Sequence, residues 1–217
     1  QSSIEYCAKS YIYHVTESFQ QSYKEGITIW LTDEKNEVKK LKIYQEEGSL
    51  PAADPIMTGD GLALYADDTT LDPIRELCEQ HGYDKNDVVQ VIAAQMAGTH
   101  AGDYFAFLIY MTPTPDEKRL ISNIQRRLRH VTKRAVTLGY GPRYLHSTGQ
   151  YHKGAGNNGV FWQLTADDAP DVEIPDSDYS FGTLFNAQAA GDLQALHGHN
   201  RRAIRVHLTG DRTIGLQ

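Results

Sequence analysis

The segment YFAFLIYM (104–111) is apolar along almost its whole length. Successive side chains of a strand point to opposite faces of its sheet, so a strand of this composition needs apolar cover on both faces. Such a strand is typical of the centre of a largely parallel sheet. The rest of the chain must then supply helices for two faces, which predicts a layered α/β domain.

Helical and strand patterns alternate along the rest of the chain. TPDE (114–117) is a capping box with proline at the first helical position, and apolar residues at helical spacing continue from it to Leu138. Asp72 and Pro73 predict a second helix start, and Gly82 predicts its end. The predicted elements are strands at 61–66, 104–111, 159–165 and 203–208 and helices at 72–81, 86–97, 115–138 and 180–196.

The last predicted strand alternates strictly between apolar and polar residues. Ile204, Val206 and Leu208 are therefore expected to face the core, and Arg205 and His207 to face outward. Together the elements predict an α/β fold with a largely parallel sheet, flanked by helices in layers.

The stretch before this domain has a different composition. GSLPAADPIMTGDG (48–61) is rich in Gly, Pro, Ala and Asp, which are typical of a connection. We therefore expect a linker at 48–60, an N-terminal helical segment at 1–47 and the α/β domain at 61–217. A chain of 217 residues has room for one such domain and a small appendage.

Charge and composition narrow the expected setting. The formal net charge is −7, which argues against nucleic acid as a partner. No apolar run approaches the roughly 18 residues of a membrane helix, so no membrane partner is expected. Cys7 and Cys78 are too far apart for a disulfide framework, and a cytoplasmic location is the expectation.

The stretch from Gly139 to Asn158 is the strongest candidate for a functional site. It reads as a long loop between a helix and a strand, and its glycines permit positive φ, so that backbone N–H groups can turn toward one anion. Hydroxyl donors, cations and two histidines accompany them. The candidate site residues are Arg143, His146, Ser147, Thr148, Gln150, His152 and Lys153.

Other interpretations of these residues remain open. Glycines serve turn geometry, and surface histidines and lysines are often only solvated. The basic residues of 118–134 are interpreted as a solvated helix face. His197 and His199 lack a third ligand at a recognised metal-binding spacing, so neither a metal nor a cofactor is expected.

A family resemblance adds to this interpretation. GYGPRYLHSTGQYHKG and GVFWQLT, within 139–165, resemble the C-terminal region of bacterial bifunctional transaldolase/phosphoglucose isomerases. The blocks GDGLALYAD (59–67), AGDYFAFLIYM (101–111), YSFGTLFNAQAAGDLQAL (179–196) and RRAIRVHL (201–208) are similar to motifs of that family, in its order. The resemblance covers roughly 48 to 208. It implies a sugar-isomerase (SIS-like) domain that acts on glucose 6-phosphate and fructose 6-phosphate.

The chain also departs from the family pattern. HVTES (14–18) is similar to a family motif that ends in a lysine, but Phe19 stands at that position. Single-function phosphoglucose isomerases carry a glutamate just before the glycine of their related segment, where this chain has Lys153. No glutamate lies between Leu120 and Asp171. An aldose–ketose isomerase needs a base within hydrogen-bond reach, and the segment offers only histidines for it.

The resulting hypothesis is a phosphosugar isomerase domain without a cofactor, in which His146 and His152 exchange protons. Arg143, Ser147, Thr148, Gln150 and Lys153 would contact the sugar phosphate. The expected partners are that substrate and the remaining portions of a larger parent enzyme, with self-association left open. The alternative is a non-catalytic module that completes a composite site or mediates oligomerisation. A metal-dependent hydrolase is a third, remote alternative.

Overall fold

The computed structural model describes residues 54–217, except 146, 168–170 and 176–178. The segment expected at 1–47 and the first part of the expected linker therefore lie outside the described residues. The helices and strands are β1 (Met57–Gly59), β2 (Leu62–Tyr65), α2 (Asp68–His81), α3 (Val88–Ala97), β3 (Tyr104–Tyr110), α4 (Pro115–Thr132), β4 (Ala135–Tyr140), α5 (Thr148–Gly154), β5 (Gly159–Ala166), α6 (Phe181–Gly198), β6 (Arg202–Leu208) and α7 (Arg212–Gly215).

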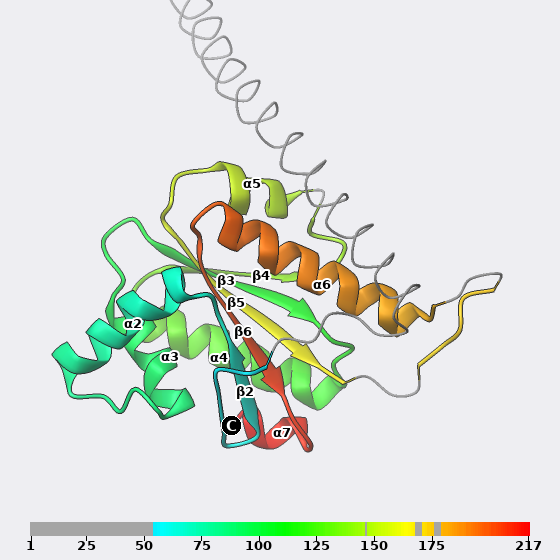
Figure 1. The fold of residues 1–217 in the computed structure, drawn as a ribbon, viewed down its shortest axis with the longest axis horizontal. Coiled ribbons are helices and arrows are strands. Elements are labelled where there is room, and N and C mark those ends of the chain that lie inside the picture. Colours follow the sequence, from blue (N-terminus) through cyan, green and yellow to red (C-terminus); the bar gives the residue numbers. More distant parts are fainter. Residues whose placement is uncertain (1–53, 146, 168–170, 176–178) are drawn as a thin grey trace, which may run out of the picture.

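One six-stranded sheet organises these elements, in the order β1-β2-β6-β5-β3-β4. The four strands from β6 to β4 are parallel, and β2 and β1 add an antiparallel pair at the β6 edge. Figure 1 shows α5 and α6 on one face of the sheet and α2, α3 and α4 on the other. We call these the α5–α6 face and the α2–α4 face. The layered, largely parallel α/β prediction is confirmed.

Strand β3 lies inside the sheet, as its composition predicted. Phe105, Phe107 and Ile109 pack in the core of the α2–α4 face, whereas Ala106 and Leu108 pack in the core of the α5–α6 face. All five are at most 1% exposed. Strand β3 therefore contributes to both apolar cores, as β5 and β6 also do.

The predicted helix at 115–138 is wrong in its last six residues. The capping box is present, with Thr114 and Glu117 bonded reciprocally, but the helix ends at Thr132. Lys133 takes the left-handed conformation (φ 57°) and β4 follows at once. Helical apolar spacing continues across this break, and a lysine rather than a glycine makes it, so the sequence carried no stop signal there.

Three smaller corrections concern the start of α2, the expected linker and strand β6. Helix α2 begins at Asp68, because the Asp67 side chain accepts from the Thr70 N–H, and Pro73 lies inside the helix. Residues 57–59 of the expected linker form β1 within the sheet. Arg205 and His207 do not face solvent freely, because α6 packs over their side of the sheet.

Candidate functional site

The candidate segment begins where β4 ends, at the carboxyl edge of the parallel strands. The Gly141 N–H donates to the Ile109 carbonyl of β3 at 2.9 Å, and residues 141–147 then lead into α5. Strand order reverses between β3 and β5: β3 connects through α4 to β4 on one side of it, and the chain then returns past β3 to β5. Ligand sites of open α/β sheets lie at such reversals, outside the carboxyl ends of the strands.

Three of the predicted site residues have exposed side chains on this segment. Arg143 lies in the loop, Ser147 precedes α5, and Thr148 is its first residue. Gln150 is half-buried one turn further on. His146 lies outside the described residues. The loop therefore presents a guanidinium and two hydroxyl groups to solvent, which are donors suited to an anion or a sugar.

The glycines of the segment do not act as predicted. None of Gly139, Gly141, Gly149, Gly156 and Gly159 has positive φ. Gly139 and Gly141 permit close packing instead: a Cβ on Gly141 would lie 2.4 Å from the Tyr110 ring, and one on Gly139 would lie 2.9 Å from Tyr144. The expectation of an anion nest built on positive φ is therefore wrong, and the aromatic rings beneath the loop account for these two glycines.

His152 faces inward from α5. It is 5% exposed, and its Nδ1 lies 2.8 Å from the Tyr104 hydroxyl. Burial lowers the pKa of His152 to about 4, with Asp192 opposing the shift and Lys153 adding to it. The imidazole is therefore neutral at pH 7, and its one described hydrogen bond is internal to the protein.

Lys153 is the most deeply buried cation of the segment. Its side chain is 2% exposed and its Nζ lies 2.7 Å from Asp192 Oδ1, on α6. The Tyr144 hydroxyl donates to the other oxygen of the same carboxylate. Burial, followed by the charge of Asp192, raises the pKa of Tyr144 well above its usual value. The Asp192 carboxylate of α6 thus binds both α5, through Lys153, and the loop, through Tyr144.

Several polar residues beneath α6 were missed by the sequence analysis. Arg205 Nε donates to Gln163 Oε1 at 2.7 Å, and the Gln163 amide donates to the Ala189 carbonyl of α6 at 2.9 Å. The signal for Asp192 was present, because it is the one acid among the apolar residues of the inner face of α6. Gln163 and Arg205 were visible only as polar residues in strand patterns.

The N-terminus of α6 also lies at the carboxyl edge, where helix N-termini often bind anions. Here the Asp171 carboxylate occupies that position. It accepts from the Gly182 N–H at 2.8 Å and from the Ser180 hydroxyl, and these bonds lower its pKa. The helix end is therefore closed by an anion of the chain itself.

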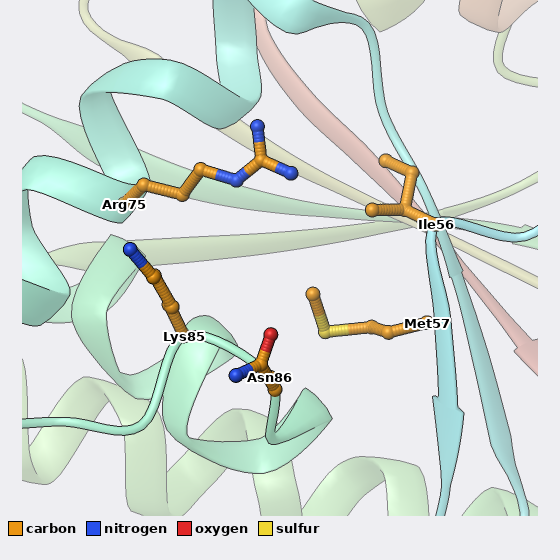
Figure 2. A pocket seen from close by; sticks show the side chains of 5 residues that line it. All are labelled: Ile56, Met57, Arg75, Lys85 and Asn86. Atoms are coloured by element: carbon orange, nitrogen blue, oxygen red, sulfur yellow. The ribbon is translucent and has the colours of Figure 1, made fainter.

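Two surface cavities lie on the α2–α4 side, away from the loop. Figure 2 shows the first, of about 370 Å³, with Arg75 and Lys85 facing Ile56 and Met57. Arg75 is half-buried and Lys85 is exposed, and each pairs with a carboxylate of α2 at 3.3 Å. The second, of about 400 Å³, lies between α2, the end of α3 and the loop before β6.

Within the described ranges, no group of three or more His, Cys, Asp or Glu side chains is placed to hold a metal ion. His197, which the sequence paired with His199, contacts the Ala203 carbonyl at 2.9 Å instead. Among the described helices, none has the length and apolar character needed to cross a membrane.

The chain was compared with family models, curated proteins and solved structures. No family model matches the chain, and no curated protein matches its sequence. Among solved structures, hypothetical protein TT0462 from Thermus thermophilus is similar over 65% of this chain, with 16% identity and a TM-score of 0.48. The chain spans 39% of the length of that protein.

Proposed function

We propose that this chain is a phosphosugar isomerase domain that interconverts glucose 6-phosphate and fructose 6-phosphate and contacts its substrate through the 141–148 segment. The observation that supports it best is the group of exposed donors Arg143, Ser147 and Thr148, beside a reversal of strand order. The resemblance of the surrounding sequence blocks to transaldolase/phosphoglucose isomerases supplies the substrate class.

The reaction moves a proton between two carbons of the sugar. A base removes the proton from C2 of the open-chain aldose, the resulting enediol rearranges its hydroxyl proton, and C1 receives a proton to give the ketose. His146 and His152 are the proposed proton carriers. His152 is neutral at pH 7 and can accept a proton, but its pKa of about 4 makes it a weak base, and its burial requires that α5 move or that it act through Tyr104. Arg143 would hold the phosphate.

A non-catalytic module is the second candidate, and a specific observation favours it. Lys153 forms a buried ion pair with Asp192, and His152 is hydrogen-bonded to Tyr104. The stretch 118–166 contains no carboxylate that could serve as a base. In that case the domain would complete or cover a composite site in a larger parent protein, or hold an oligomer together. Both proposals place the protein in the cytoplasm.

The test is isomerase activity of the chain on fructose 6-phosphate, read by a coupled dehydrogenase. The isomerase proposal expects turnover that falls at least tenfold in Arg143→Gln and His146→Ala and stays unchanged in Arg126→Gln, an exposed arginine of α4. No turnover, but a rise in melting temperature with the sugar phosphate, would indicate half of a composite site. Neither turnover nor a shift would favour the structural module.

A further inference from the structure

Two consecutive arginines, Arg201 and Arg202, are among the residues that line the second cavity, and within the described residues only Arg202 pairs with a carboxylate. Arg201 is 9% exposed, and its Nη2 donates to two backbone carbonyl oxygens, those of Lys153 and, at 2.7 Å, Ala155. No carboxylate pairs with it among the described residues. A buried guanidinium that bonds only to neutral acceptors keeps an uncompensated charge, which is costly unless an anion is near.

Arg202 lines the same cavity. Its Nη1 donates to Asp103 Oδ2 at 2.9 Å, while its Nε and Nη2 are buried without a hydrogen-bond partner among the described residues. Asp103 is therefore the one carboxylate paired, within the described part of the chain, with either guanidinium. The only acid among the lining residues is Glu76, which is exposed.

The rest of the lining combines apolar and neutral polar groups. Pro73, Ile74 and Leu77 of α2 supply the apolar part, and Thr69 and Gln95 supply hydroxyl and amide groups. A volume of about 400 Å³ is within the usual range of small-molecule sites. An inorganic ion would leave most of this space and its apolar wall unused.

We propose that this cavity binds a small organic anion, a phosphate ester or a carboxylate, with its charged group at Arg201 and Arg202 and its body against α2. The cavity is lined by α2, the end of α3 and residues 200–202, and no residue of the 141–148 segment lines it. The site goes beyond the proposed isomerase function and does not depend on it.

Titration calorimetry of the full chain at constant ionic strength tests the proposal, with inorganic phosphate, glycerol 3-phosphate and malate as probes. We expect one saturable site for at least one organic anion, with inorganic phosphate binding more weakly. Arg202→Gln should weaken binding at least tenfold. Arg126→Gln should leave it unchanged, because Arg126 does not line the cavity.

Arg202→Gln also breaks the ion pair with Asp103, so a second variant keeps both arginines. Thr69→Glu places a carboxylate in the cavity wall and in the first turn of α2, where an acid favours the helix. It should fold normally and weaken binding at least fivefold. Ser122→Glu, on the exposed face of α4, makes the same charge change and should have no effect.

Two results would overturn the proposal. One is the absence of saturable binding for all three probes. The other is binding that survives Arg202→Gln and Thr69→Glu, or that is lost in Arg126→Gln, since this would assign it to the basic surface of α4. Loss in Arg143→Gln alone would assign the anion to the 141–148 segment, which would support the isomerase proposal and contradict this one.

Discussion

At the scale of single residues, the side chains of the candidate segment fall into an exposed group and a buried group. Arg143, Ser147 and Thr148 are exposed, whereas His152 and Lys153 are buried and bonded within the protein. Sequence alone grouped all of them, because residue type and proximity do not say which side of a short helix faces the sheet. The partners that decide this, Asp192 and Tyr104, lie far away along the chain, on α6 and β3.

Lys153→Met tests the buried ion pair. The substitution keeps the length of the side chain but leaves the Asp192 carboxylate buried without its cation, so we expect a loss of about 3–5 kcal/mol in the free energy of unfolding. Denaturant titration followed by circular dichroism measures it. Adding Asp192→Asn should restore part of the loss, and the exposed Lys118→Met should change little. A Lys153→Met chain as stable as the native one would contradict the role assigned to the pair.

His152 predicts a pH dependence of stability. Its folded pKa of about 4 lies below the usual 6.5, so the unfolded chain binds more protons between these values. Stability is therefore fully present above pH 6.5 and is lost as the pH falls toward 4. The loss from this group is on the order of 3 kcal/mol.

Denaturant titrations at several pH values, compared with His152→Gln, measure this contribution. The variant should lose less stability between pH 6.5 and 4 than the native chain, whereas His130→Gln, on the exposed face of α4, should follow the native curve. Parallel curves for the native chain and His152→Gln would show that the imidazole is not buried in its neutral form.

At the scale of elements, the sequence predicted every long strand and helix that has a clear start signal, and it failed where two elements share one pattern. The apolar residues Leu128, Val131 and Ala135 continue the spacing of α4, yet Val131 is 69% exposed and Ala135 begins β4. Helix α5 was read as loop, because two of its seven residues are glycine. Tertiary contacts with Tyr144 and α6 hold it in place.

Gly141→Ala tests the close packing of the loop after β4. A Cβ at this position would lie 2.4 Å from the fully buried Tyr110 ring, so the backbone or the ring must move, at a cost of about 1–3 kcal/mol. The melting temperature should fall accordingly. Gly156→Ala is the matched control, because nothing lies within 4 Å of its added methyl group. Equal melting temperatures for both variants would contradict the packing.

At the scale of the whole molecule, the order of the strands predicts that local stability falls from the inner strands of the sheet to its edges. Amides of β3 and β5 lie inside the sheet under two apolar cores, whereas β1 and β4 are edge strands. Hydrogen exchange read by mass spectrometry should therefore show the slowest exchange in β3 and β5. Peptides from β4 should exchange markedly faster than those from β3. Equal protection of the two would indicate that the β4 edge is covered in solution.

The aromatic core of the α2–α4 face also gives the protein an optical signature. Trp162 is 7% exposed, its ring contacts those of Phe105 and Phe107, and it donates its indole N–H to Gln95. The one other tryptophan, Trp30, lies outside the described residues. A Trp30→Phe chain would therefore have a single tryptophan, with blue-shifted emission shielded from acrylamide. Gln95 also lines the second cavity, where we propose that an anion binds. The emission of Trp162 would therefore report both the packing of the core and the binding of an anion in that cavity.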